Sequence, residues 1–311
     1  MKAYVLYEAG GPDKLLLSEV PQPVLKKGEV LIKVKAIGIN PADAIYRNSP
    51  AFLDALFGEN RPVIIGWDIS GEIVAKAEDT EGFEIGDAVF ALLPNACGYA
   101  EFVSVNTNWI THKPATIGFE EAAATPMAGL TAWQPLVHGM KIKKGDKILI
   151  HAAAGGVGHF AVQIAKYLGA KVIATSSAKN QDFVMALGAD EHIDYQKENF
   201  WEVIKDADFV LDTVGGETLE RSVDATKAGG TIISILGFTN DNLKAMAKEK
   251  GVNVMAWGMR PNIEDLKAIA DVMAKGIIKP RISTIYPFKL MPDAHTQIET
   301  RRTAGKIVVT L

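Results

Sequence analysis

A group of small residues that ends at position 158 is well suited to bind a ligand through its backbone. It follows directly after a short apolar run. The run reads Lys147-Ile-Leu-Ile-His-Ala-Ala-Ala-Gly-Gly-Val-Gly158, with small residues at Ala153, Gly155 and Gly158. Small side chains let a tight turn approach a ligand, and a helix that starts at the turn offers its first N–H groups to an anion. The pattern therefore predicts a cradle for the diphosphate of a dinucleotide. Its residues are Gly155, Gly156, Val157 and Gly158.

The elements on either side of this turn are those that the motif requires. A strand at 148–150 leads into the turn, a second strand is expected at 171–175, and Gly169 is suited to end the helix between them. Apolar residues recur at helical spacing after the turn. They are Val157, Phe160, Ala161, Ile164, Ala165 and Leu168. A structural glycine turn in another kind of α/β protein is the alternative interpretation.

The end of the second strand indicates which dinucleotide the turn would hold. An acidic residue there binds the ribose 2′-hydroxyl of NAD, but this chain reads Thr175-Ser-Ser-Ala-Lys-Asn180 and has no carboxylate before Asp182. Hydroxyls and a cation suit a 2′-phosphate. We therefore predict NADPH as the cofactor, with Ser176, Ser177 and Lys179 facing its phosphate. Serines that only stabilise a loop and a solvated surface lysine are the alternatives.

The composition argues against several classes of function. The 311 residues carry a formal net charge of −4, with 48% hydrophobic and 23% charged residues. This balance gives no basic field, so we expect no nucleic-acid partner. No stretch approaches about 18 uncharged residues, and the apolar run at 1–7 is too short for a signal peptide, so we expect no membrane association. The single cysteine, Cys97, suits a reducing compartment, and we expect a cytoplasmic protein.

Two kinds of element pattern follow each other along the chain. Short strands are expected at 28–36, 69–75, 88–92 and 100–105, separated by Gly and Pro, which predicts a folded-up antiparallel β unit. Strands then alternate with helices, as a parallel sheet requires. These strands are expected at 147–152, 171–175, 209–213, 231–236 and 252–257. The fold class is therefore α/β, with one β-rich domain and one doubly wound parallel sheet.

The last fifty or so residues follow neither pattern. They hold a helix near 264–275, a short strand, a second helix that opens at Pro292, and a final strand at 306–310. Because this final strand is isolated in the sequence, we expect it to return to the first domain.

Several motifs add a family resemblance. They include Gly38-Ile-Asn-Pro-Ala-Asp43, Ala154-Gly-Gly-Val-Gly158 and Thr303-Ala-Gly-Lys-Ile307, with others at 66–74, 98–103, 128–133 and 212–216. Over nearly its whole length the chain resembles the medium-chain dehydrogenases/reductases, specifically their zinc-independent quinone oxidoreductase branch. The resemblance implies a GroES-like catalytic domain at 1–121, a Rossmann NADP-binding domain at 122–258, and a segment at 259–311 that returns to the catalytic domain. It also implies a homo-oligomer, either a dimer or a tetramer.

The resemblance implies further contacts with the cofactor. Ligands of a parallel sheet lie at the carboxyl ends of its strands, and the implied backbone contacts to ribose and nicotinamide lie there. They are Val214, Leu236, Gly237, Phe238 and Trp257. Thr131 matches the family threonine that approaches the nicotinamide, and Tyr195 matches a ring beside the 2′-phosphate. A helix hydroxyl bonded to its own backbone is the alternative for Thr131.

We expect no metal site. A catalytic zinc needs Cys, His or carboxylate ligands in a tetrahedral site with one open position. The similar zinc alcohol dehydrogenases have a cysteine where Asn40 stands and Gly-His-Glu where Gly66-Trp67-Asp68 stands, and the six histidines of this chain show no ligand spacing. Simple alcohols would lack a Lewis acid, whereas quinones and α,β-unsaturated carbonyls need only positioning and hydrogen-bond polarisation.

The substrate side is expected around the segment that begins at Asn40. Its candidate residues are Asn40, Asp43, Tyr46, Phe52, Trp67 and residues 92–94. We predict that Asn40 and Tyr46 are catalytic and contact the substrate oxygen. Quinone reductases often have a tyrosine at the position of Ile45, and the one-residue step to Tyr46 turns a helical side chain by about 100°. A helix cap at Asn40 and a helix N-terminal charge at Asp43 are the structural alternatives.

These expectations combine into one function. The chain is predicted to be an NADPH-dependent oxidoreductase that transfers a hydride to a quinone or a similar electron-poor compound without a metal. The proton that completes the reduction would come from solvent or from Tyr46. Two alternatives remain open. One is a 2-alkenal or enoyl reductase of the same fold, and the other is a protein that binds NADPH without catalysis.

Overall fold

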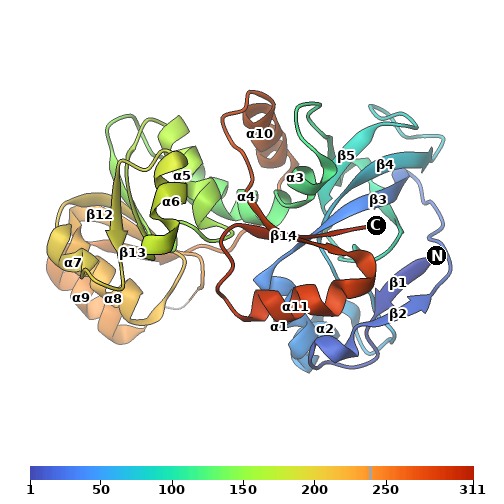
Figure 1. The fold of residues 1–311 in the computed structure, drawn as a ribbon, viewed down its shortest axis with the longest axis horizontal. Coiled ribbons are helices and arrows are strands. Elements are labelled where there is room, and N and C mark those ends of the chain that lie inside the picture. The colour runs from blue at the N-terminus through green and yellow to red at the C-terminus, as the bar shows by residue number, and fades with distance from the viewer. Residues whose placement is uncertain (238–239) are drawn as a thin grey trace. The chain divides into compact units, whose positions relative to one another are not determined.

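The chain forms two units in a computed structural model, which describes residues 1–237 and 240–311. Unit 1 comprises Met1–Ala128 and Pro261–Leu311, and unit 2 comprises Gly129–Arg260. Both termini lie in unit 1 (Figure 1). The sequence had placed the corresponding boundaries after residues 121 and 258.

Unit 1 is built on a seven-stranded sheet in which β14, β15, β3, β4, β5 and β7 follow one another and β6 also pairs with β3. All its pairings are antiparallel except that of β14 with β15. A separate antiparallel pair joins β1 and β2. The strands are β1 Lys2–Val5, β2 Leu16–Glu19, β3 Glu29–Ile39, β4 Asp68–Lys76, β5 Ala88–Leu92, β6 Phe102–Asn106, β7 Ile110–His112, β14 Ile282–Pro287 and β15 Lys306–Thr310. The final strand thus lies beside β3 in this unit.

Helices of unit 1 connect these strands. They are α1 Pro41–Asn48, α2 Pro50–Phe57, α3 Phe119–Ala123, α10 Ile263–Ala274 and α11 Met291–Glu299. Proline at the first position of α1 and of α2 suits a helix start, because its missing N–H would have no partner there. Helix α4, Pro126–Gln134, spans the boundary between the units. Short turns complete the list: η1 Pro12–Lys14, η2 Thr107–Trp109, η3 Pro135–Gly139, η4 Ala178–Asn180 and η5 Phe288–Leu290.

Unit 2 is a parallel six-stranded sheet in the order β10–β9–β8–β11–β12–β13. The strands are β8 Lys147–Ile150, β9 Lys171–Ser176, β10 Glu191–Asp194, β11 Ala207–Asp212, β12 Thr226–Ser234 and β13 Asn253–Ala256. Its helices are α5 Gly158–Tyr167, α6 Gln181–Ala186, α7 Phe200–Val203, α8 Gly216–Ala225 and α9 Asp241–Lys250. The strand order reverses between β8 and β11, and ligands of such sheets bind at the carboxyl ends of the strands at this point. The predicted α/β fold class is confirmed.

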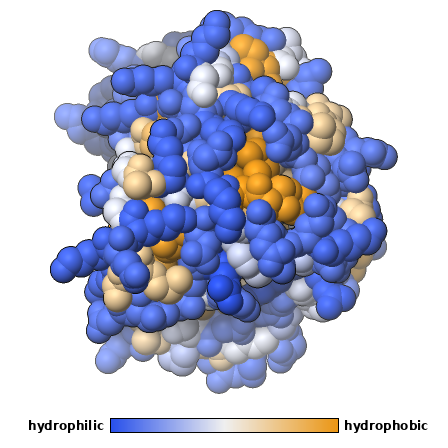
Figure 2. All heavy atoms as spheres, turned by 90° about the vertical axis from the view of Figure 1, so that its left-hand side faces the viewer, coloured by the Kyte–Doolittle hydropathy of each residue, from blue (hydrophilic) through white to orange (hydrophobic). Residues whose placement is uncertain are grey.

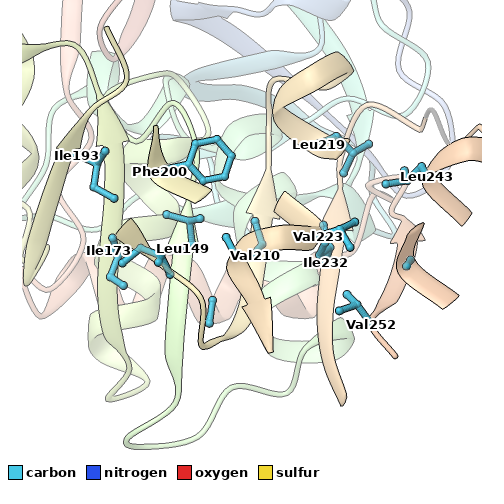
Figure 3. Packing of buried hydrophobic residues seen from close by; sticks show 14 residues of the cluster. Leu149, Ile173, Ile193, Phe200, Val210, Leu219, Val223, Ile232, Leu243 and Val252 are labelled. Atoms are coloured by element: carbon cyan, nitrogen blue, oxygen red, sulfur yellow. The ribbon is translucent and has the colours of Figure 1, made fainter. Parts of the chain in front are cut away.

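The core of unit 2 is apolar. Figure 3 shows side chains of the sheet, such as Leu149, Ile173 and Val210, packed with Leu219 and Val223 of α8. Each of these side chains is at most 3% exposed, and full burial of such a side chain stabilises a fold by about 1.5–3 kcal/mol. The sheet is therefore a rigid base for the loops at its edge.

The molecular face in Figure 2 is mostly hydrophilic, with small apolar patches between the polar side chains. Among the helices of the described residues, none has the length and hydropathy that a membrane span requires.

Candidate functional site

The glycine turn joins β8 to α5 in unit 2. Gly155 N donates to Ala152 O at 2.8 Å, and Ala153 N donates to the Thr175 carbonyl of β9 at 2.9 Å. A Cβ atom on Gly158 would lie 2.3 Å from Ala152 O, a distance that no side chain tolerates. Glycine at 158 therefore lets the helix begin directly against the turn, as the motif predicts.

The turn leaves a set of amides without partners. No acceptor among the described residues takes the backbone N–H groups of Gly156, Val157 and Gly158. These groups lie at the start of α5, where the helix dipole also favours an anion. The residues present thus fit a diphosphate, which would be held by backbone groups alone.

The residues predicted for the 2′-phosphate come together at the ends of β9 and β10. Tyr195, which directly follows β10, donates its backbone N–H to the Ser176 carbonyl at 3.3 Å, and its side chain is 59% exposed. Lys179 in η4 is exposed and forms no ion pair with a described residue. The serines are already engaged, since Ser176 Oγ lies 2.8 Å from His192 Nε2 and Ser177 Oγ accepts from Asn180. Lys179 is thus the group most available to an added phosphate.

Most of the other predicted cofactor residues follow the carboxyl ends of strands in unit 2. Val214 follows β11, and Leu236 and Gly237 follow β12; Val214 and Leu236 are 47% and 41% exposed. Trp257 follows β13, and its backbone N–H donates to Ser234 O at 2.9 Å. Phe238 lies outside the described residues. Thr131 lies in α4 and is half-buried.

Buried polar residues that the sequence analysis did not single out hold these strand ends in place. Asp212 ends β11, and its Oδ1 accepts from the amides of Val214 and Gly215 at 3.0 and 2.9 Å. Its Oδ2 accepts from Ser234 Oγ at 2.7 Å, which ties β11 to β12. His151, after β8, contacts the hydroxyls of Thr175 and Ser222, and burial lowers its pKa to about 4.

Asn40 lies at the centre of a buried polar network in unit 1. Its Nδ2 donates to Asp68 Oδ2 at 2.9 Å, and its Oδ1 accepts from Lys306 Nζ. Its backbone N–H donates to Asp43 Oδ2 at 2.8 Å. Asp43 therefore fills the predicted place at the N-terminus of α1, but the Asn40 side chain makes no cap hydrogen bond to that helix. Asn40 is only 2% exposed.

A second chain of hydrogen bonds runs from Arg47 to Asp43. Arg47 has only donors, so His295 Nδ1, 2.7 Å from Arg47 Nη1, must accept. The neutral ring then carries its hydrogen on Nε2 and donates to Tyr99 Oη at 2.8 Å. The Tyr99 hydroxyl in turn donates to Asp43 Oδ2 at 2.9 Å. The direction of every bond in this chain is therefore set by the arginine.

Burial shifts the pKa values of the network. It raises the pKa of Asp43 to about 7, an effect that the hydrogen bonds from Asn40 and Tyr99 oppose. It raises the pKa of Asp68 to about 6, which nearby Lys306 opposes, and it lowers the pKa of Lys306. Burial, assisted by the Arg47 charge, lowers the pKa of His295 to about 3. His295 is therefore neutral at physiological pH, as its hydrogen bonds require.

The predicted substrate residues outside this network form an aromatic cluster. The Tyr46 ring lies 4.8 Å from the Trp67 ring and 5.4 Å from the Phe52 ring, between centroids. Phe52 is 49% exposed, whereas Trp67 is 8% exposed. Trp67 O accepts from Leu93 N at 2.7 Å, which brings the segment after β5 to the same place. The cluster offers flat apolar surface of the kind that an aromatic ring packs against.

Sequence reasoning missed Lys306, Tyr99, His295 and Arg47 as members of this site. One signal in the sequence could have identified Lys306. It opens the apolar strand Lys306-Ile-Val-Val, and a lysine that is buried with such a strand is rare unless it has a specific partner. Tyr99 fits because Gly66, with φ of +99°, has no side chain, and a Cβ there would lie 2.2 Å from the tyrosine ring. Among the residues that the structure describes, no group of three His, Cys, Asp or Glu side chains is arranged to hold a metal ion.

Comparison with known proteins agrees with this architecture. A family model described as an alcohol dehydrogenase GroES-like domain matches residues 26–169, and one described as a zinc-binding dehydrogenase matches residues 187–309. The NADPH-dependent alkenal/one oxidoreductase of Arabidopsis thaliana, described as chloroplastic, is 32% identical over 99% of this chain and 79% of its own length.

Two solved structures are similar over the whole chain. The quinone oxidoreductase of Coxiella burnetii is 36% identical with a TM-score of 0.92, covering 100% of this chain and 99% of its own. The Escherichia coli quinone oxidoreductase complexed with NADPH is 28% identical with a TM-score of 0.89, and both chains are covered completely. The chain belongs to the quinone oxidoreductases of the medium-chain dehydrogenase/reductase family.

Proposed function

We propose that this protein is an NADPH-dependent reductase that transfers a hydride to a quinone or a similar electron-poor compound without a metal. The observation that carries the proposal is the set of unpartnered amides at Gly156, Val157 and Gly158, at the switch point of a parallel sheet. The solved Escherichia coli relative was crystallised with NADPH, and that of Coxiella burnetii is also a quinone oxidoreductase, which supports the cofactor and the substrate class.

In this proposal unit 2 holds the cofactor, which supplies a hydride when it is bound. The amides of Gly156, Val157 and Gly158 bind its diphosphate, whereas the Gly155 N–H is engaged with Ala152 O, and Lys179 pairs with the 2′-phosphate that distinguishes NADPH from NADH. Tyr195 offers its exposed ring beside Ser176. The ends of β11, β12 and β13 contribute Val214, Leu236 and Trp257 along the remainder of the cofactor, and Thr131 approaches the nicotinamide.

Unit 1 binds and polarises the substrate in this proposal. Tyr46 and Phe52, with the buried Trp67 behind the Tyr46 ring, offer a surface for a flat ring, and Asn40 donates a hydrogen bond to the substrate oxygen on which charge develops. A quinone needs only this polarisation, because it already accepts a hydride readily. The final proton comes from solvent or from the Tyr46 hydroxyl, which has no hydrogen-bond partner among the described residues.

A 2-alkenal or enoyl reductase is the second candidate. One observation favours it, namely the 32% identity to the NADPH-dependent alkenal/one oxidoreductase of Arabidopsis thaliana. The same residues would serve, since the carbonyl oxygen of an alkenal requires the same donor as a quinone oxygen.

Two further features belong to the proposal. The single cysteine, Cys97, supports a reducing compartment such as the cytosol. A homo-oligomer, a dimer or a tetramer, is supported by β13, which is the edge strand of its sheet and exposes Met255.

A steady-state assay tests the function. The purified protein is incubated with NADPH or NADH and with 1,4-quinones, alkenals or simple alcohols, before and after treatment with a chelator. We expect turnover with NADPH and quinones that chelation leaves unchanged. Rapid turnover of simple alcohols, or loss of quinone turnover that zinc restores, would overturn the proposal. Tight NADPH binding without any turnover would indicate a binding protein instead.

A further inference from the structure

Lys306 begins β15, and its ammonium is buried beside Asn40. The residue is 3% exposed, and its Nζ donates to the Ile39 carbonyl at 3.1 Å as well as to Asn40 Oδ1. Asp68 Oδ2 lies 4.0 Å from the same nitrogen. A buried ammonium costs free energy that an apolar side chain at this position would not. The network around it therefore gives Lys306 a role besides packing.

That role concerns the orientation of the Asn40 carboxamide. An ammonium has only donors, so the carboxamide atom that faces Lys306 must be the oxygen. The nitrogen then faces Asp68, whose Oδ2 accepts one of its two hydrogens. No acceptor among the described residues takes the second hydrogen. One donor of Asn40 thus remains, and its direction is fixed because Lys306 and Asp68 hold the other two bonds.

We propose that Lys306 is a positioning residue, which holds the Asn40 carboxamide so that its remaining N–H meets the substrate oxygen. The inference rests on the proposed function. Without the ammonium, only the bond to Asp68 holds the carboxamide, whose last torsion is broad and roughly two-fold, so the rotated orientation becomes more populated. The rotated group would present oxygen to the substrate oxygen, and the two would repel each other.

A purely structural role for Lys306, as the counter-charge of Asp68, is the competing account. Loss of Lys306 leaves Asp68 without its cation in either case, so a drop in stability does not separate the two accounts. A double-mutant cycle separates them, since a residue that acts through Asn40 has no effect on turnover once Asn40 is absent.

The experiment compares Lys306→Met, Asn40→Ala and the double variant, with NADPH and a 1,4-quinone as substrates. Asn40→Ala should lower kcat by about 10²-fold, the loss that follows removal of one preorganised donor. Lys306→Met should lower kcat by about tenfold or more with little change in KM, and the double variant should be no slower than Asn40→Ala. Lys306→Arg, which keeps a cation with only donors, should recover part of the lost kcat.

Lys33→Met is the matched control, because Lys33 is an exposed lysine on the neighbouring strand β3. It should retain the wild-type kcat. If Lys306→Met does not fold, Lys306→Leu takes its place, because its neutral side chain likewise offers no donor to Asn40 Oδ1. Effects of the two single variants that multiply in the double variant, or a wild-type kcat in Lys306→Met, would overturn the proposal.

A readout without turnover keeps this test independent of the proposed function. The side-chain amide signals of Asn40 can be assigned in ¹⁵N–¹H spectra by their loss in Asn40→Ala. We expect two resolved proton signals in the wild type and in Lys306→Arg, and exchange-broadened signals in Lys306→Met. Sharp, unchanged signals in Lys306→Met would contradict the positioning role, even if the wild type reduced no quinone.

Discussion

In unit 2 the groups offered to a ligand are backbone amides, whereas in unit 1 they are side chains joined in a buried network. The amides of Gly156, Val157 and Gly158 belong to one turn over an apolar core. The unit 1 network joins Asn40 to Asp68 and Lys306 from three separate strands and loops. The turn therefore depends on residues that have little or no side chain. The network depends instead on the chemistry of its side chains.

This difference has an energetic side. Unpartnered amides at a helix start cost little, because water satisfies them until a ligand arrives. Buried carboxylates and cations cost several kcal/mol each unless they are paired, and the pairs must then remain intact. Unit 1 consequently links the stability of the fold to the charge of its site, whereas the glycine turn of unit 2 contributes no ionisable group.

The largest effect is expected at the turn itself. Gly158→Ala places a Cβ 2.3 Å from Ala152 O, so the turn or the helix must move. We expect the free energy of unfolding to fall by about 1–3 kcal/mol, as in other overpacked sites. The dissociation constant of NADPH should rise by about 10²-fold, which corresponds to a loss of about 2.7 kcal/mol of binding free energy, because the amides no longer point at the diphosphate. Fluorescence titration measures the affinity, and chemical denaturation measures the stability.

Val157→Ala is the matched control at the same turn, because Val157 contributes only its amide. Its NADPH affinity should stay close to the wild type. A loss of affinity as large as that of Gly158→Ala would show that side chains bind the cofactor, and the contrast between the units would fail.

The next largest effect is the pH dependence of the free energy of unfolding, which the buried Asp43 of unit 1 should cause. The folded state raises the pKa of Asp43 from 3.8 to about 7, so it retains a proton that the unfolded chain releases. The stability from Asp43 is therefore full below about pH 4 and is lost as pH rises to about 7. Asp43→Asn removes this dependence, so wild type should lose on the order of 1–3 kcal/mol relative to the variant across that window.

Urea denaturation at several pH values measures this difference. The histidines with lowered pKa values, His151 and His295, change stability in the opposite direction, but they are present in both proteins and cancel. Asp271→Asn, on the exposed side of α10, serves as the control. Parallel stability curves for wild type and Asp43→Asn would show that Asp43 is ionised in the fold throughout.

A smaller effect is expected at Lys179, where a side chain contributes to the unit 2 site. Lys179→Ala should weaken NADPH binding by about tenfold, the value of one charge-assisted hydrogen bond, and should leave NADH binding unchanged. Lys248→Ala, an exposed lysine of α9, should change neither affinity. Equal losses for both nucleotides would remove Lys179 from the phosphate site.

The smallest effect is expected at Tyr46. Tyr46→Phe removes a hydroxyl that has no described partner and keeps the ring against Trp67 and Phe52. Stability should therefore be unchanged, and kcat for quinones should fall only a few-fold because solvent can also supply the proton. A kcat loss of about 10²-fold or more would identify the hydroxyl as an obligatory donor.

The unit 2 turn could be predicted from the sequence more completely than the unit 1 network. The turn at 155–158 and the strand before it were predictable, because the motif is contiguous and needs no distant partner. Strand β15 was also predicted, with the bounds that it has in the structure. The pair of β1 with β2 was missed, since β2 is short and largely exposed and gives no alternating pattern.

The unit 1 network was only partly predictable for a physical reason. Asn40 was identified, but its bond to Lys306 spans 266 residues, and the bond of Tyr99 to His295 spans 196. No local spacing relates such pairs, because the folded sheet alone brings them together. From the sequence, His295 was considered only as a candidate metal ligand, whereas the structure shows it as a buried link of the chain that ends at Asp43.

A crystal structure of the protein grown with NADPH tests the central claim most directly. We expect diphosphate oxygens within hydrogen-bond distance, about 3 Å, of the amides of Gly156, Val157 and Gly158. We also expect the 2′-phosphate to lie against Lys179. A diphosphate bound elsewhere, with this turn contacting only water, would contradict the account.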